Sequence, residues 1–147
     1  MTADPSPARR PRRIYLDTSA YLCLLLGEKG SDAIAAETSG AALLSSVLLV
    51  LESRRNIIRL ARAGTITAEQ CQTSLDRVEK DMDHFALRDL TLDLCLSATM
   101  PVVTTPRSLD LVHLRTALWF HKEERIDRFF TLDQTQAAAA RELGLPS

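Results

Sequence analysis

Cysteine and histidine are scarce in this chain of 147 residues, which has three of each. The cysteines, Cys23, Cys71 and Cys95, are odd in number and far apart, and no C-x-x-C pair occurs. They are typical of small buried side chains in a reducing compartment, and they argue against a disulfide framework. The histidines form no H-x-x-x-H pair either, so the sequence does not predict a zinc site.

Long apolar runs and a strong net charge are also missing. No stretch approaches the roughly 18 apolar residues of a membrane span, and the arginine-rich start has no convincing cleavage site for a secretion signal. We therefore expect a cytoplasmic protein without a membrane partner. The net charge is −1; residues 1–13 carry +3, which leaves −4 for the rest. Such a mildly acidic body is not typical of a non-specific nucleic-acid binder, so any nucleic acid would be held by local patches or through a metal ion.

What remains is the composition of an ordinary globular domain, 46% hydrophobic and 25% charged. The length fits one domain with a real core. Residues 1–12, rich in Pro, Arg and Ala, are predicted to form a mobile basic tail, and residues 13–147 a single domain. No internal repeat is present.

Apolar runs and helix signals alternate along the chain. The predicted strands are Ile14–Leu16, Ala41–Ser45, Phe85–Thr91 and Ile126–Leu132. The predicted helices are Thr18–Leu26, Ser31–Gly40, Val47–Ala63, Thr67–Asp83, Leu92–Met100, Thr105–His121 and a last one that begins at Asp133 or Thr135 and ends at Gly144. This alternation favours an α/β fold with a parallel sheet and helices on both of its faces.

Several helix ends carry recognisable signals. Ser31 is predicted to be an N-cap, and Thr67 with Gln70 to form a capping box. Thr105 followed by Pro106 is typical of a cap and a first helical position.

Four carboxylates stand at the edges of apolar stretches. They are Asp17 in RRIYLDTSAYL, Glu52 in SSVLLVLESRR, Asp110 in TPRSLDLVHLRTAL and Asp133 in FFTLDQTQAAAARELG. Two follow predicted strands and two lie near helix starts, so we expect all four at the rim formed by the carboxyl ends of the strands. Four acids there would repel one another unless a cation joined them. Carboxylate oxygens suit Mg²⁺ or Mn²⁺, and such a site commonly hydrolyses phosphodiesters.

Each acid also has a structural interpretation. Asp17 is as compatible with a helix cap as with a functional role, Asp133 is a good N-cap, and Asp110 suits the helix dipole. Glu52 is compatible with a solvated position among the arginines of its helix. These arginines are typical of a solvated face, and a contact with an RNA backbone is the second interpretation. His113 is predicted to pack or bond locally rather than to catalyse. The prediction of a metal site therefore depends on the four acids together.

These segments resemble the PIN-domain family, and within it the VapC-like toxins of bacterial toxin–antitoxin pairs. D-T-S-A-Y-L at Asp17 is similar to the opening motif of the family, and S-x-x-x-x-x-E, from Ser46 to Glu52, to its second acidic position. R-S-L-D-L-V-H-L-R-T-A-L at Asp110 resembles its most distinctive segment, and F-F-T-L-D at Asp133 its fourth. The resemblance spans Ile14 to Leu145.

The resemblance implies a three-layer α/β/α sandwich with a central parallel sheet of four or five strands. It implies an endoribonuclease that depends on Mg²⁺, with Mn²⁺ as an alternative, in which Asp17, Asp110 and Asp133 bind the metal directly or through water. Glu52 would complete the acidic pocket and position or polarise the attacking water. Nearby hydroxyls are expected to bond these carboxylates: Thr18, Ser19 and Thr131. A cognate antitoxin that blocks the cleft and a homodimer are also implied.

The chain departs from the family pattern in two places. Leu111 stands where the family has Ala, and Arg115 where small residues are common, and both substitutions are expected to reshape the pocket. The sequence ends soon after Gly144, so the last edge strand of the family is predicted to be short or missing.

Three alternatives stay open beside the toxin. One is a PIN nuclease for RNA processing without an antitoxin, and another is a catalytically silent PIN-like binding module. The third is a receiver-like signalling module, which would have paired acids after the first strand and a lysine after the last. Neither feature is present here.

Overall fold

The computed structural model describes residues 9–96, 103 and 107–147. Its strands are β1 (Arg13–Leu16), β2 (Ala42–Ser46), β3 (Phe85–Arg88) and β4 (Arg128–Phe130). Its helices are α1 (Thr18–Leu26), α2 (Ser31–Thr38), α3 (Leu48–Arg62), α4 (Ala68–Met82), α5 (Leu92–Leu96), α6 (Ser108–Glu123) and α7 (Gln134–Glu142). The predicted alternation of strands and helices is confirmed over these residues.

The described strands form one parallel sheet in the order β3-β2-β1-β4. In β1, Ile14 pairs with Leu43 of β2 on one side and with Arg128 of β4 on the other. The parallel sheet predicted from the sequence is therefore confirmed, with four strands in the described part of the chain. Because all strands run the same way, their carboxyl ends share one edge, where ligands gather in such sheets.

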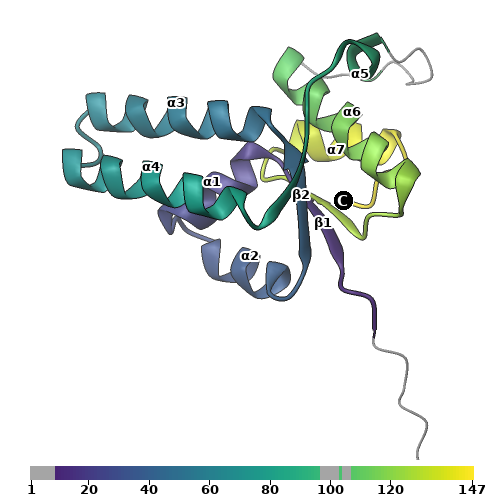
Figure 1. The fold of residues 1–147 in the computed structure, drawn as a ribbon, viewed down its shortest axis with the longest axis horizontal. Helices are drawn as coiled ribbons and strands as arrows, with labels where there is room; N and C mark the ends of the chain where they lie inside the picture. The colour runs from purple at the N-terminus through teal and green to yellow at the C-terminus, as the bar shows by residue number, and fades with distance from the viewer. Residues whose placement is uncertain (1–8, 97–102, 104–106) are drawn as a thin grey trace, which may run out of the picture.

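Side chains of β1 alternate between the two faces of the sheet, as a strand requires. Tyr15 packs on one face in a cluster that includes Leu114 of α6 and Ala140 of α7. Ile14 and Leu16 pack on the other face in a cluster that includes residues of α1 and α2. Figure 1 shows α6 and α7 on one side of the sheet and α1 to α4 on the other. Helices therefore cover both faces, as expected for an α/β sandwich.

Helices α3 and α4 form an antiparallel pair beside the sheet (Figure 1). Leu49 and Ile57 of α3 and Val78 of α4 are buried with Tyr21 of α1 in a third apolar cluster. Most of the other residues of this pair are exposed or only partly buried. Helices α3 and α4 thus pack against the rest of the protein through this one apolar cluster.

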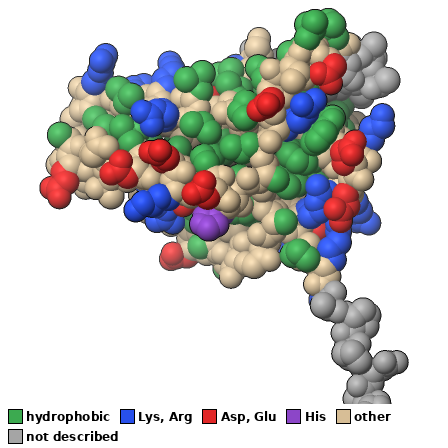
Figure 2. Space-filling view, viewed as in Figure 1, with side chains coloured by type: hydrophobic (Ala, Val, Ile, Leu, Met, Phe, Trp, Pro, Cys, Tyr) green, Lys and Arg blue, Asp and Glu red, His purple; other side chains and the backbone are tan. Residues whose placement is uncertain are grey.

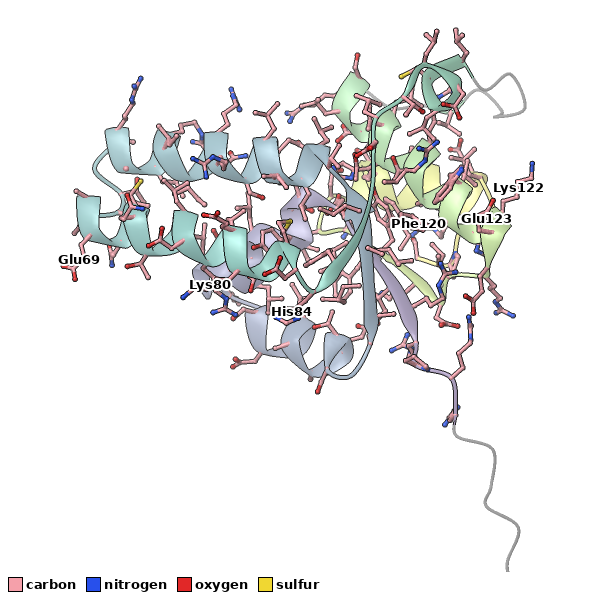
Figure 3. The ribbon with its side chains drawn as sticks, viewed as in Figure 1. Glu69, Lys80, His84, Phe120, Lys122 and Glu123 are labelled. Carbon is pink, nitrogen blue, oxygen red and sulfur yellow. The ribbon has the colours of Figure 1, made fainter. Side chains whose placement is uncertain are left out.

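Helix α6 shows which side of each helix is buried. Figure 3 shows Phe120 directed toward the sheet and Lys122 directed away from it. Phe120 is 7% exposed and belongs to the core around Tyr15, whereas Lys122 is exposed. The neighbouring Trp119 lies under the guanidinium of Arg88, 4.6 Å from the ring centroid, which links α6 to the end of β3.

Several predicted boundaries need correction. Ser31 is not the N-cap of α2; the cap is Gly30, whose φ of 94° is rarely adopted by any other residue. Helix α6 begins at Ser108 with Arg107 as its N-cap, so Pro106 is not at its first position; Pro106 itself lies outside the described residues, as does the end of the predicted helix Leu92–Met100. The third and fourth strands are also shorter than predicted, because pairing stops at Arg88 and Phe130.

The capping box at the start of α4 is confirmed. Thr67 Oγ1 accepts from Gln70 N at 3.0 Å, and Gln70 Oε1 accepts from Thr67 N at 2.8 Å. We expect Thr67→Ala to lower the free energy of unfolding by about 1 kcal/mol, because one backbone N–H of the first turn loses its partner. Urea denaturation measures this. Thr73→Ala, at an exposed position inside the same helix, is the control and is expected to be neutral or slightly stabilising.

The ends of the described chain are tied to the body. Residues 1–8 of the predicted tail lie outside the described residues, but Arg10 forms an ion pair with Glu124 at 2.5 Å, and Arg12 one with Glu37 at 3.6 Å. At the other end, Phe129 N donates to the carbonyl of Pro146 at 2.5 Å.

Exposed leucines collect on and around α5. Leu92 and Leu96 are 73% and 67% exposed, and Leu90 and Leu109 are exposed as well. Figure 2 shows hydrophobic side chains over α5 and in the middle of the same face. Among the described residues, no helix is both long and apolar enough to cross a bilayer.

Candidate active site

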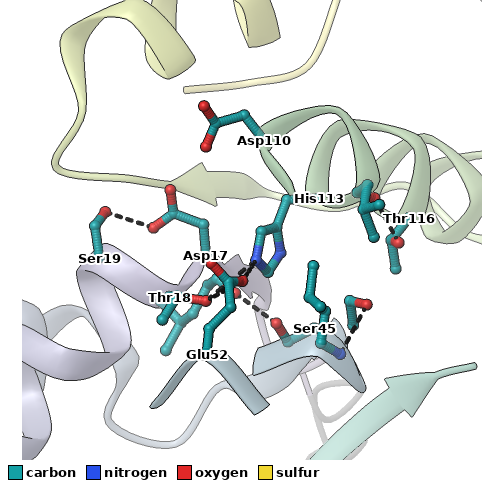
Figure 4. Close-up of polar contacts among 12 residues, drawn as sticks. Asp17, Thr18, Ser19, Ser45, Glu52, Asp110, His113 and Thr116 are labelled. Atoms are coloured by element: carbon teal, nitrogen blue, oxygen red, sulfur yellow. Dashed lines mark hydrogen bonds and ion pairs between the residues drawn. The ribbon is translucent and has the colours of Figure 1, made fainter. Parts of the chain in front are cut away.

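Asp17 lies at the junction of the central strand and the first helix. Its backbone N donates to the carbonyl of Phe130 at 3.1 Å, which extends the contact between β1 and β4. Its side chain N-caps α1: Oδ1 accepts from Ser19 Oγ at 2.6 Å and from Ala20 N at 3.1 Å. Figure 4 shows the second carboxylate oxygen on the side of Asp110. Strand and helix together thus fix a carboxylate that is only 5% exposed.

The surroundings of Asp17 disfavour its charge. Burial raises the pKa of Asp17, and this outweighs the hydrogen bonds from Ser19 and Thr131 and the charge of His113, which act to lower it. A buried carboxylate with a raised pKa gains stability from a proton or from a cation. Asp17 is therefore placed where binding of a metal ion would relieve an unfavourable charge.

Asp110 faces Asp17 from the first turn of α6 (Figure 4). Its pKa is raised, first by burial and then by the negative charges of Asp133 and Asp17; Arg107 acts against these causes. The like-charge effects show that the three acids lie within reach of one another's fields. The structure thus brings Asp17, Asp110 and Asp133 to one edge of the sheet, as the sequence predicts.

Asp133 serves as a helix cap in this structure. Its Oδ1 accepts from Thr135 N at 2.8 Å and from Gln136 N at 3.1 Å, at the start of α7. Gln136 is buried, and its Nε2 donates to the carbonyl of Asp110 at 2.9 Å. The cap therefore also fixes α7 against the first turn of α6. The structural interpretation of Asp133 holds, and the residue still contributes its charge to the site.

Glu52 approaches the site from α3, on the other side of Asp17. Its Oε1 accepts from Thr18 Oγ1 at 2.7 Å and from His113 Nε2 at 2.9 Å. Burial raises the pKa of Glu52, but the hydrogen bonds and charge of His113 together with the Thr18 hydrogen bond outweigh burial, so the pKa is lowered. The surroundings of Glu52 therefore favour its charged form, whereas those of Asp17 and Asp110 disfavour it.

His113 is the residue that the sequence interpretation undervalued. It is 2% exposed, and it bonds to Glu52 of α3, Tyr15 of β1 and Thr18 of α1, so its partners are not local as predicted. A signal was available in the sequence. Residues three apart lie on the same face of a helix, so His113 had to point to the same side of α6 as Asp110.

Two of the three hydroxyls that the family resemblance implies, those of Thr18 and Ser19, hydrogen-bond a carboxylate of the site. Thr18 bonds Glu52 and Ser19 bonds Asp17. Thr131 Oγ1 accepts from Asp133 N at 3.1 Å and lies 3.3 Å from Ser19 Oγ. These hydroxyls connect the ends of β1 and β4 and hold the acids in their orientations.

The two residues that depart from the pattern of the resembled family, Leu111 and Arg115, both lie on α6. Arg115 donates from Nη1 to the carbonyl of Leu94 at 3.2 Å, so it joins α6 to α5. Leu111 is partly buried in the first turns of α6. The arginines of α3 fit a solvated face, because all of them are exposed: Arg54, Arg55, Arg59 and Arg62.

Within residues 9–96, 103 and 107–147, no group of three or more His, Cys, Asp or Glu side chains is arranged to hold a metal ion. Asp133, which the sequence adds to Asp17 and Asp110, uses its carboxylate to cap α7. The donor chemistry nevertheless fits Mg²⁺, which commonly binds one or two protein carboxylates and keeps several of its waters. Asp17 and Asp110 supply such a pair.

Comparison with known proteins adds no family. A scan against protein-family models found no match, and neither did a search of curated proteins. The likeness to PIN domains therefore rests on the motifs around the four acids.

Proposed function

We propose that this chain is a PIN-like, metal-dependent endoribonuclease that hydrolyses RNA phosphodiester bonds and acts as the toxin of a toxin–antitoxin pair. One observation carries the proposal: two partly desolvated aspartates of raised pKa, Asp17 and Asp110, face one another at the carboxyl edge of the sheet, beside the ionised Glu52. Opposite pKa shifts among neighbouring carboxylates are typical of catalytic sites in which the carboxylates have different roles.

The residues divide into two roles. Asp17 and Asp110 would hold Mg²⁺ or Mn²⁺, with Asp133 as the third acid implied by the sequence. When bound, the metal lowers the pKa of a water molecule and offsets negative charge on the scissile phosphate. Glu52, whose Oε1 is fixed by Thr18 and His113, accepts a proton from the attacking water and orients it.

An acidic site must also accept the negatively charged backbone of RNA. Arg107, the N-cap residue of α6, is exposed and close enough to lower the pKa values of both Asp110 and Glu52. It lies at the positive end of the α6 dipole, where a phosphate is favoured. Arg107 is thus the residue that we expect to contact the RNA phosphate next to the cleaved bond.

The antitoxin and the homodimer are proposed from the sequence resemblance. Neither changes the chemistry of the site. The same residues would serve a PIN nuclease for RNA processing, and the two possibilities differ in whether a small partner protein inhibits cleavage.

Metal dependence is the direct test. We expect the purified full chain to cleave a labelled RNA in the presence of Mg²⁺ or Mn²⁺ and to stop in excess EDTA. Mn²⁺ at 100 times its Kd should add about 2.7 kcal/mol to the free energy of unfolding. For a chain of this length that corresponds to a rise in Tm of roughly 5–10 °C. Asp32→Asn, at an exposed position in α2, is the matched control and should behave as wild type. Metal-independent cleavage, or Tm unaffected by Mn²⁺, would contradict the proposal.

A further inference from the structure

A chain of hydrogen bonds runs from the core of the sheet to Glu52. Tyr15 Oη lies 2.8 Å from His113 Nδ1, and His113 Nε2 lies 2.9 Å from Glu52 Oε1. Tyr15 is fully buried and His113 is 2% exposed, whereas the side chain of Glu52 is 19% exposed. The chain thus begins in the apolar core and ends at the edge of the acidic site, where Figure 4 shows His113 beside Glu52.

The direction of each hydrogen bond follows from the groups involved. An ionised carboxylate can only accept, so His113 Nε2 must carry the proton that it donates to Glu52. In the neutral ring Nδ1 is then an acceptor, and the hydroxyl of Tyr15 is its donor. Thr18 Oγ1 gives its proton to the same oxygen of Glu52 and lies 3.2 Å from His113 Nε2. The hydrogen bonds that Tyr15, Thr18 and Glu52 make in this chain are therefore all consistent with one tautomer of His113.

The core holds the start of this chain rigidly. Tyr15 stacks on Phe129, with ring centroids 5.3 Å apart and an angle of 10° between the rings. The ring of His113 packs edge-on against Tyr15 at 5.8 Å. Tyr15 also stands two residues before Asp17, which directly follows the last residue of β1. The central strand therefore places Asp17 through its backbone and Glu52 through the side chains of Tyr15 and His113.

We propose that His113 is a positioning residue, which with Tyr15 orients the Glu52 carboxylate toward the metal-binding aspartates. This inference rests on the proposed nuclease function for its purpose, although the orientation itself is a property of the fold. The alternative is that His113 merely fills the core with its polar atoms satisfied. A core-filling role predicts loss of stability on substitution, whereas a positioning role predicts loss of turnover that a hydrogen-bond donor restores.

The tautomer of His113 is measured without any activity. In ¹⁵N NMR spectra of the full chain, at a pH about two units above the ordinary histidine pKa of about 6.5, we expect a proton on Nε2 and none on Nδ1. In Tyr15→Phe the Nδ1 resonance should shift, because its donor is removed, while the fold is kept. A proton on Nδ1 in the wild-type protein, or an unchanged resonance in Tyr15→Phe, would overturn the proposal.

Kinetics test the purpose of this orientation. His113→Leu keeps an apolar volume without a donor, and we expect its kcat for RNA cleavage to fall roughly 10- to 100-fold, with KM little changed. His113→Gln retains an N–H near the position of Nε2 and should recover most of the loss. His84→Gln, at an exposed position, is the control and should match wild type.

The outcomes separate the two proposals. Equal losses of kcat in His113→Leu and His113→Gln, or a loss confined to KM, would overturn the positioning role. If His113→Leu does not fold, Tyr15→Phe takes its place, and a kcat equal to that of wild type would overturn the role. Absence of cleavage by the wild-type protein would overturn the nuclease, while the NMR result would still confirm or refute the orientation of Glu52.

Discussion

Asp17→Asn is expected to reduce metal-dependent RNA cleavage by a factor of roughly 10³, because loss of a charged ligand removes several kcal/mol of transition-state stabilisation. The substitution is nearly isosteric. Asparagine retains the side-chain oxygen that accepts from Ser19 Oγ and Ala20 N, so α1 keeps its cap. The loss of activity would therefore not come from a change in fold.

The same substitution is expected to stabilise the metal-free protein at neutral pH. Burial raises the pKa of Asp17 in the folded state above its unfolded value. The contribution of such a group to stability is fully present below the ordinary Asp pKa of about 3.9 and is lost as the pH rises through the folded pKa. Asp17→Asn has no charge to bury. The two proteins should thus differ most at neutral pH and converge in acid.

Urea denaturation over a range of pH in EDTA, together with cleavage assays, measures both effects. With Mn²⁺ the order of stability should reverse, because wild type gains binding energy that the variant cannot. Asp32→Asn again serves as the control and should show neither effect. Retention of cleavage by Asp17→Asn would show that Asp17 is not part of the active site. A lower stability of Asp17→Asn than of wild type at neutral pH in EDTA would show that the charge of Asp17 is well solvated.

Phe129→Ala is expected to lower the free energy of unfolding by about 3–5 kcal/mol. Phe129 is 1% exposed, pairs with Tyr15 across β1 and β4, and stacks on its ring. Its removal opens a cavity under the ring that supports His113. Because a domain has only about 5–15 kcal/mol of stability, most of the margin would be lost.

Phe85→Ala is the matched comparison for this change. Phe85 is also an aromatic residue of the sheet, but it is partly exposed on the edge strand β3 and packs edge-on against Tyr21. We expect a smaller loss of stability than for Phe129→Ala in the same urea titration. Equal losses would mean that the core around Tyr15 is not the main support of the sheet.

Much of this fold is predictable from the sequence, because its strands and helices carry local signals. Asp17 illustrates this well: a short apolar run ends at an acid that then caps a helix, and the structure has that arrangement. Prediction failed at one local backbone conformation and at two strand ends that depend on distant residues. The cap of α2 depends on a φ of 94° at Gly30, and the lengths of β3 and β4 depend on where pairing with neighbouring strands stops.

The candidate site shows the same division. The position of all four acids at one rim follows from strand direction and helix starts, so the sequence predicts it. The link from Tyr15 through His113 to Glu52 joins residues 98 and 61 positions apart, and no local pattern contains it. The capping role of Asp133 could be foreseen as one of two interpretations, but only the structure shows where its oxygen points.

The stack of Arg88 on Trp119 has a practical consequence. Trp119 is the single tryptophan of the chain, and it lies on α6, the helix that carries Asp110 and His113. Its indole contacts the end of edge strand β3 on one side and Phe120 of the core on the other. The protein thus contains its own fluorescent probe. Its emission is expected to change when α6 separates from the sheet, so unfolding can be followed by fluorescence without any added label.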